Sequence, residues 1–240
     1  MLKVCVTFDC ERLISLKQGN PEWSLFQRFK GKINYLIRNF RYNEKGFELL
    51  YQEIKKQKFP CTLIIVGKLF KPIEKLDFIE WGYHSYNHVP LTHITEERLE
   101  KEVKNIYKLK SFTAPMWRIE EESKPERIYN SLKKEGYKNV TYMGKNKGYK
   151  SFFKEKIAKP EMRYGLKCIH VSNYLEGNSS KEHIKKIKKE IIDNSNKEAV
   201  YLLTGHDFTH KNVKNIMEMI LFLKELERNK KIKLVKMDEA

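Results

Sequence analysis

Two acidic residues follow the first apolar segment of this 240-residue chain. Val4–Phe8 reads as a strand, and Asp9 and Glu11 come directly after it. Because side chains alternate along a strand, Asp9 and Glu11 can project to one side while Cys10 turns away. Carboxylates at the C-terminal end of a strand stand where α/β folds place catalytic groups. The alternative is that they begin a loop or cap a helix.

Two histidines follow a later apolar segment, Phe78–Gly82. His84 and His88 are four residues apart, and on a helical turn this spacing puts both rings on one face. Such a pair suits zinc or a similar ion. Taken alone, a packed or surface pair of histidines explains the spacing equally well.

A third apolar segment, Ala199–Leu203, leads to His206 and Asp207. His206 could shuttle a proton near neutral pH, and Asp207 could tune it. Alone, His206 is more often a structural histidine. However, a closed parallel sheet would bring all three strand ends to one rim, so together they predict a single site.

The elements that must position these residues alternate along the chain. Apolar, β-branched runs predict strands, and segments of 3.6-residue periodicity predict helices between them. This alternation predicts a mainly parallel sheet, either open or closed into a barrel. The predicted strands are 4–8, 62–66, 78–82, 140–143, 168–171, 199–203 and 232–235, and the predicted helices are 44–57, 95–109, 124–135, 180–194 and 210–229.

Two segments, 10–43 and 144–166, fit neither pattern. The first is rich in aromatic and basic residues, and the second is rich in lysine and glycine. We expect insertions or long loops that could wall the site, within one domain spanning 1–240.

Composition and charge restrict the expected cellular location and the expected binding partners. The start reads as a strand rather than a signal peptide, and no window approaches the roughly 18 apolar residues of a membrane span, so we expect a cytoplasmic protein. The formal charge of +17 could attract nucleic acid, anionic lipid or a phosphorylated substrate, or merely solubilise lysine-rich helices. Peripheral contact with a membrane fits this charge, whereas no nucleic-acid-binding motif is visible. The sequence leaves the oligomeric state open.

The order of these clusters resembles the NodB-homology polysaccharide deacetylases, carbohydrate esterase family 4. Thr7-Phe8-Asp9 resembles the opening motif of that family, and His84-Ser85-Tyr86-Asn87-His88 matches its His-Ser-x-x-His motif. Phe112-Thr113-Ala114-Pro115 looks like its Arg-x-Pro segment, and Leu202 to His206 looks like its closing Leu-x-x-x-His segment. The resemblance spans residues 4 to about 208.

The chain departs from the family pattern twice. Asp9-Cys10-Glu11 replaces the usual Asp-Asp pair, which leaves open whether Glu11, Asp9 or Cys10 completes a metal site. Thr113 stands where the family commonly has arginine. Arg118 could substitute for that arginine, or it could be a surface or salt-bridging residue.

The resemblance implies a single (β/α) barrel, a distorted seven-stranded one of the NodB type, and metal-assisted removal of an N-acetyl or N-formyl group from an amino-sugar. His84, His88 and Glu11 would hold a divalent ion. Asp9 would be the general base, and His206 would protonate the leaving amine. Zinc is the first expectation for the metal, and iron, cobalt, nickel and manganese suit the same ligands.

The expected substrate is a small amino-sugar compound, with a nucleotide- or lipid-linked precursor favoured by the charge. Pro115, Trp117 and Arg118 are the candidate substrate-binding residues, although barrel packing also explains an aromatic group there. Three alternatives remain: hydrolysis of a cyclic amide, a Cys10 nucleophile, and a non-catalytic relative that binds carbohydrate or nucleic acid.

Overall fold

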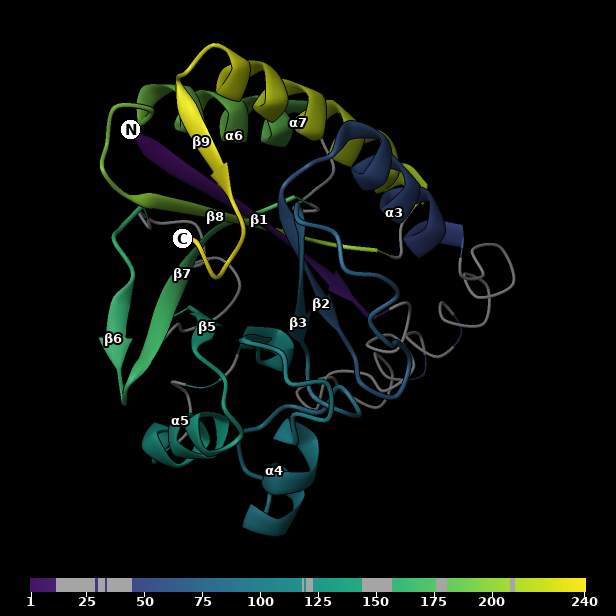
Figure 1. Cartoon of the computed structure of the whole chain (residues 1–240), viewed down its shortest axis with the longest axis vertical. Coiled ribbons are helices and arrows are strands. Elements are labelled where there is room, and N and C mark those ends of the chain that lie inside the picture. The colour runs from purple at the N-terminus through teal and green to yellow at the C-terminus, as the bar shows by residue number, and fades with distance from the viewer. Residues whose placement is uncertain are drawn as a thin grey trace.

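Seven parallel strands close into a barrel (Figure 1). The computed structural model describes residues 1–11, 29, 33, 45–117, 119, 123–143, 157–175, 181–207 and 210–240. The ring closes because β1 pairs in parallel with β8 on one side and with β2 on the other. The barrel strands are β1 (Leu2–Cys10), β2 (Cys61–Ile65), β3 (Ile79–Tyr83), β4 (Ser111–Thr113), β5 (Asn139–Tyr142), β7 (Leu166–Tyr174) and β8 (Val200–His206).

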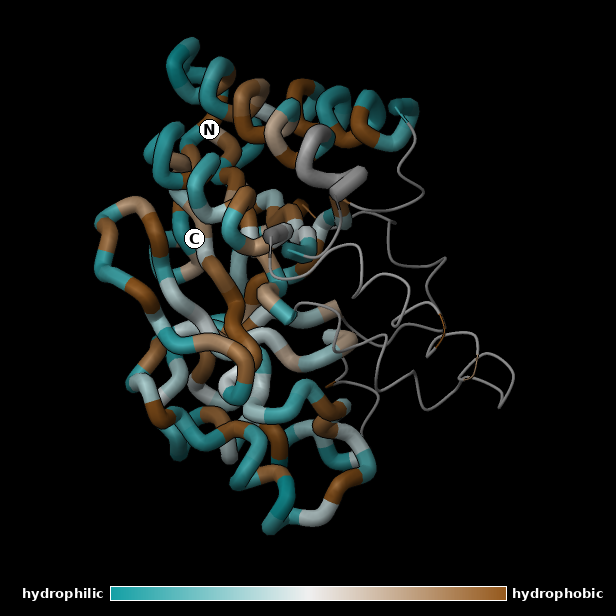
Figure 2. The backbone as a smooth tube through the Cα atoms, turned by 90° about the vertical axis from the view of Figure 1, so that its right-hand side faces the viewer, coloured by the Kyte–Doolittle hydropathy of each residue, from teal (hydrophilic) through white to brown (hydrophobic). Residues whose placement is uncertain are grey.

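Amphipathic helices pack outside this ring. In α6, Ile184, Ile187 and Ile191 are buried, which is the spacing that places one apolar face against the sheet. Bands of apolar and polar residues alternate along the helices in Figure 2. Among the described residues, no helix combines the length and apolar character needed to cross a membrane. The helices are α3 (Lys45–Gln57), α4 (Glu96–Val103), α5 (Pro125–Lys134), α6 (Lys181–Asp193) and α7 (His210–Arg228).

Alternation along the strands separates two apolar clusters. Val4, Val6 and Phe8 of β1 belong to the large core between sheet and helices. Cys5 belongs to a smaller cluster, with Ile169 and Leu202 among its other members, which fills the barrel. Side chains of β1 alternate with a period of two, so the odd-numbered residues that follow Cys5 face inward toward the rim.

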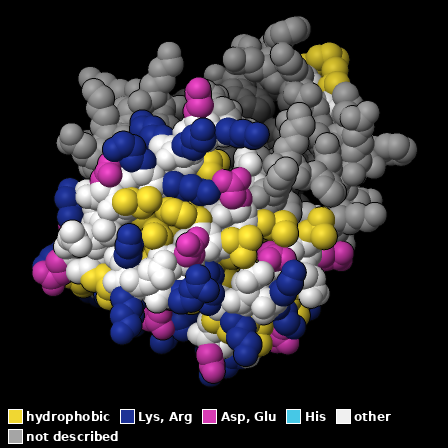
Figure 3. Space-filling view, turned by 90° about the horizontal axis from the view of Figure 1, so that it is seen from above, with side chains coloured by type: hydrophobic (Ala, Val, Ile, Leu, Met, Phe, Trp, Pro, Cys, Tyr) yellow, Lys and Arg dark blue, Asp and Glu magenta, His cyan; other side chains and the backbone are white. Residues whose placement is uncertain are grey.

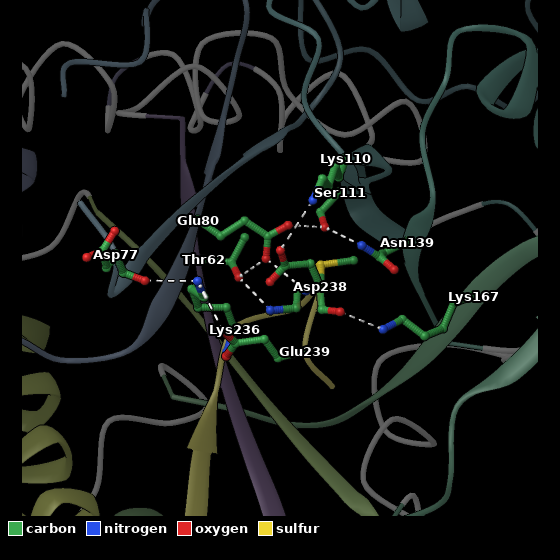
Figure 4. Close-up of polar contacts among 11 residues, drawn as sticks. Thr62, Asp77, Glu80, Lys110, Ser111, Asn139, Lys167, Lys236, Asp238 and Glu239 are labelled. Atoms are coloured by element: carbon green, nitrogen blue, oxygen red, sulfur yellow. Dashed lines mark hydrogen bonds and ion pairs between the residues drawn. The ribbon is translucent and has the colours of Figure 1, made fainter. Parts of the chain in front are cut away.

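The floor of the barrel is closed by the segment after β9 (Ile232–Val235). The strand β9 itself pairs with the first half of β1, Leu2–Cys5, whereas β2 pairs with the second half, Thr7–Cys10. The chain then crosses beneath the ring, where Met237 N donates to Thr62 Oγ1 at 2.9 Å. Lys167 Nζ donates to the carbonyl oxygen of Asp238 at 3.0 Å (Figure 4).

Glu80 is the central acceptor of this floor. Its carboxylate accepts hydrogen bonds from Thr62 Oγ1 at 3.0 Å, from Asp238 N at 2.9 Å and from the hydroxyl of Ser111. Burial raises the pKa of Glu80, and the hydrogen bond from Ser111 opposes that rise. The carboxylate therefore links three strands and the crossing segment.

We expect Glu80→Ala to lower the free energy of unfolding by about 2 kcal/mol, because buried donors lose their acceptor. Urea denaturation measures the change. The control is Glu198→Ala, which removes only an exposed ion pair with Lys159 and should leave the denaturation midpoint almost unchanged. Equal losses in the two variants would contradict the role given to Glu80.

The strand and helix boundaries differ from the sequence expectations in identifiable places. The strand predicted at 232–235 exists as β9 but lies outside the ring, and β4 takes the seventh place. β4 was missed because three residues are too few to show a period.

The helix expected over 95–109 ends at Val103, and Ile106 is 48% exposed. Beyond that end, Asn105 accepts from Leu109 N and donates to Leu109 O, which competes with helical bonds.

The segment 144–166, expected as an insertion or long loop, contains a short strand near its end. Glu161–Arg163 forms β6, which pairs antiparallel with β7. Residues 144–156 lie outside the described part of the chain, as do 12–28, 30–32 and 34–43 of the other expected insertion.

Candidate metal and catalytic site

Three potential metal ligands meet at the C-terminal rim of the barrel. One ligand atom each of Glu11, His84 and His88 lies within 4.8 Å of the others. Glu11 directly follows β1, and His84 directly follows β3. Glu11 Oε2 lies 3.9 Å from His84 Nε2 and contacts His88 Nε2. All three residues are at most 3% exposed, so the cluster is a buried donor set.

The protonation states of His84 and Glu11 fit a divalent cation. His84 Nδ1 donates to the carbonyl oxygen of Thr113 at 2.7 Å, which leaves the Nε2 lone pair directed at the cluster. Burial, with His88 nearby, lowers the pKa of His84 to about 3, so this ring is neutral. Burial alone would raise the pKa of Glu11, but His88 and His206 hold it well below its usual range. A neutral imidazole and a carboxylate are the forms in which these two side chains bind zinc-like ions.

The loop from His84 to His88 is a tight non-helical turn, so the two rings are brought together by this turn and not by the spacing of a helix. Ser85 and His88 adopt left-handed backbone angles, with φ of 60° and 58°. His88 N donates to Ser85 Oγ at 3.0 Å. The loop still brings the two rings together, with centroids 4.8 Å apart.

Glu102 of α4 anchors this loop. Its carboxylate accepts from Asn87 N at 2.8 Å and from Asn87 Nδ2 at 2.9 Å. Its carbonyl oxygen accepts from Tyr86 N at 2.9 Å, which ties the loop to the last turn of α4. Because Glu102 is only 2% exposed, its carboxylate bonds are shielded from water, and the helix fixes the position of His88.

We expect Glu102→Ala to weaken metal binding about 10- to 100-fold, because the loop that carries His88 loses its anchor. Competition with a chromophoric chelator measures the affinity. The matched control is Glu97→Ala on the same helix, where the side chain is 79% exposed and pairs with Lys101. The same affinity in the Glu102 variant and the wild type would contradict this role.

The two candidate catalytic residues lie on neighbouring strands at this rim. Asp9 of β1 is in register with His206 of β8, and Asp9 is 1% exposed. His206 Nε2 lies 3.2 Å from Glu11 Oε1. Asp207, expected to tune His206, accepts a hydrogen bond from Glu11 N through Oδ1 at 3.3 Å. The structure therefore brings Asp9, His206 and the three potential ligands to one rim.

Comparison with known proteins rests on structure. No family model matches the sequence, and no curated protein is significantly similar to it. A Mycobacterium smegmatis protein assigned as a polysaccharide deacetylase superposes with a TM-score of 0.63 at 13% identity, covering 99% of this chain and 88% of that chain. The chain has the polysaccharide deacetylase fold.

Two further structures share this deacetylase fold. A family 4 carbohydrate esterase from Streptomyces lividans, solved with acetate, gives a TM-score of 0.51 at 10% identity, covering 97% of this chain and 91% of that chain. A CE4 family pseudoenzyme from Bacillus anthracis gives 0.54 at 10% identity, covering 99% and 64%. These similarities confirm the predicted NodB-type barrel, and activity must be argued from the side chains.

Thr113, which stands where the sequence resemblance would place an arginine, forms a hydroxyl pair with Thr141. Thr141 Oγ1 donates to Thr113 Oγ1 at 2.9 Å, across β5 and β4. The carbonyl oxygen of Thr113 also holds His84, as described above. Arg118, the candidate substitute for that arginine, lies outside the described residues.

Aromatic rings flank His206. Trp117 follows Met116 in a 3-10 turn, Pro115–Trp117, in which both residues have left-handed angles, with φ of 59° at Met116 and 52° at Trp117. The Trp117 ring lies 6.5 Å from the His206 ring, measured between centroids. Pro115 is buried at the start of this turn. Trp117 therefore stands beside the catalytic candidates, and Pro115 contributes to packing.

Sequence reasoning missed Tyr174, whose hydroxyl lies 2.8 Å from His206 Nδ1. The strand containing it was predicted to end at Val171, whereas β7 continues to Tyr174. Extending that strand by three residues would have placed a tyrosine at the rim, but no motif marks this position.

Cys10 faces away from the site. It belongs to the large outer core, and its thiol donates to the carbonyl oxygen of Phe8 at 3.4 Å. Burial, reinforced by the negative charges of Asp207 and Asp9, raises the pKa of the Cys10 thiol. A thiolate nucleophile is therefore disfavoured at this position. All four cysteines of the chain are buried free thiols.

Proposed function

We propose that this protein is a metal-dependent hydrolase that removes an N-acetyl or N-formyl group from an amino-sugar. The observation that carries the proposal is the buried set of Glu11, His84 and His88 beside two proton-transfer candidates, Asp9 and His206. A divalent ion held by this set would supply Lewis acidity, and zinc suits the ligands best.

The roles of Asp9 and His206 follow from their chemistry. The Asp9 carboxylate would take a proton from the attacking water and so act as general base. His206, as the imidazolium, would donate its Nε2 proton to the sugar nitrogen and keep Nδ1–H, so that the amine leaves and the acid product forms. This Nε2 lies 3.2 Å from Glu11 Oε1, which accepts its hydrogen bond.

A phosphate-bearing substrate is supported by the distribution of charge. On the face shown in Figure 3, basic and acidic side chains are interspersed. In α6, Lys188 and Lys189 pair with Glu218 and Asp193 at 2.7 Å. By contrast, the two segments predicted to wall the site are rich in basic residues. Lysine and arginine in such walls would attract a nucleotide- or lipid-linked amino-sugar.

Acetate release tests this function directly. The metal-loaded protein is assayed on three compounds: N-acetylglucosamine, a neutral oligomer of N-acetylglucosamine, and N-acetylglucosamine linked to a nucleoside diphosphate. We expect faster turnover of the nucleotide-linked compound, with an advantage that shrinks as salt rises. A fully metal-loaded protein that releases acetate from none of these compounds would favour a carbohydrate-binding relative, and turnover of a cyclic amide alone would favour that hydrolase class.

A further inference from the structure

A β-bulge interrupts the pairing of β7 with β8 just before the rim. Val171 is in register with Leu202, but Asn173 is in register with Leu203, so Ser172 is an extra residue. Ser172 Oγ accepts a hydrogen bond from Leu202 N at 3.1 Å. This hydroxyl supplies an acceptor where the backbone pairing of the two strands is broken. The amide of Leu202 therefore keeps a hydrogen-bond partner at the bulge.

The bulge reverses which side chains face inward. Val171 packs in the cluster that fills the barrel, and strict alternation would turn Asn173 inward as well. Instead, Asn173 Nδ2 donates to Glu190 Oε2 of α6 at 3.0 Å, outside the ring. Tyr174 is then in register with Thr204 and packs against the inner cluster. One inserted residue thus places a tyrosine inside the rim.

Tyr174 is fixed there by contacts on several sides. Its carbonyl oxygen accepts from His183 Nε2 of α6 at 2.7 Å. Its ring lies 5.8 Å from that of Trp117 and 5.4 Å from that of His206, both in edge-to-face arrangements. Its hydroxyl meets His206 Nδ1 at 2.8 Å. The phenol is therefore a preorganised partner for one nitrogen of His206.

We propose that Tyr174 is a positioning residue that holds His206 with Nε2 directed at the reacting group. A hydroxyl can accept from Nδ1–H of the imidazolium and of the neutral ring that remains once Nε2 has given up its proton, and it can donate to Nδ1 of the Nε2–H tautomer. The same ring orientation is thereby kept before and after proton transfer. The catalytic consequence rests on the proposed function, whereas the hydrogen bond itself does not.

The test is Tyr174→Phe, which removes the hydroxyl and keeps the ring. We expect kcat for acetate release to fall about 10- to 100-fold, while KM stays within about twofold and the metal content is unchanged. The control is Tyr142→Phe on β5, whose hydroxyl donates to Glu161 at 2.7 Å away from the cluster. This control should leave kcat unchanged.

A second readout does not depend on activity. Nitrogen chemical shifts of labelled histidine, with His206 assigned by its absence in His206→Gln, report which ring nitrogen carries the proton. The same shifts report hydrogen bonding at each ring nitrogen. We expect the wild type to show an Nδ1 resonance displaced by the hydrogen bond to the phenol, and Tyr174→Phe to lose that displacement. That change without acetate release in the wild type would support the positioning and reject the proposed function. An unchanged Nδ1 resonance, or an unchanged kcat in an active enzyme, would overturn the inference.

Discussion

Replacing both His84 and His88 by alanine should reduce bound divalent metal from about one ion per chain to nearly none and abolish acetate release. Two of the three donors in the buried cluster are then missing, and Glu11 alone cannot hold the ion. Elemental analysis of purified wild type and variant measures the metal, and acetate is assayed on the same samples.

The control for this experiment is His93→Ala. His93 is an exposed histidine in the same region of the chain but outside the donor set, and its loss should leave the metal content unchanged. A double variant that keeps a stoichiometric ion would contradict the ligand assignment. A wild type that cannot be loaded with any divalent metal would favour the non-catalytic binding alternative.

Asp9→Asn and His206→Gln should each lower kcat about 10²- to 10⁴-fold while leaving the metal bound. Asparagine keeps the shape of Asp9 but cannot accept the proton of the attacking water. Glutamine keeps a polar side chain at position 206 but cannot deliver a proton to the amine. Steady-state acetate release measures kcat, with metal content determined in parallel.

These two variants separate proton transfer from metal binding. Loss of activity together with loss of metal would mean that Asp9 or His206 supports the ion rather than the chemistry. Full activity in either variant would reject the role assigned to that residue. Because asparagine matches aspartate in shape at the buried position 9, repacking should add little to the measured change.

The sequence predicted that the candidate residues would meet at one rim, because they lie at or directly after strand ends. Glu11, His84 and His206 all lie at such ends. A closed parallel sheet brings these ends together independently of the conformation of the loops. Five predicted helices have counterparts for a similar reason, since each buries one apolar face whose period is visible along the chain.

The remaining features depend on contacts between distant segments. The loop carrying His88 is shaped by Glu102 on the next helix, and its left-handed residues have no signature in the residue types Ser and His. Tyr174 reaches the site only because Ser172 is an extra residue relative to β8. A one-residue slip turns every later side chain of the strand to the opposite face of the sheet. Strand periodicity alone therefore cannot show that Tyr174 points into the barrel.

The shared pairing of β1 has a consequence for biosynthesis. Glu11, His84 and His88 are synthesised early. However, β1 pairs along most of its length with β8, and its first half also pairs with β9, and both of these strands are synthesised late. A nascent chain that stops before residue 200 carries the whole donor set and β2, but it lacks β8, which pairs with β1 from Lys3 to Asp9 and closes the ring. Assembly of the rim must therefore wait for late synthesis, and the long sequence separation of these pairs should make barrel closure a slow step.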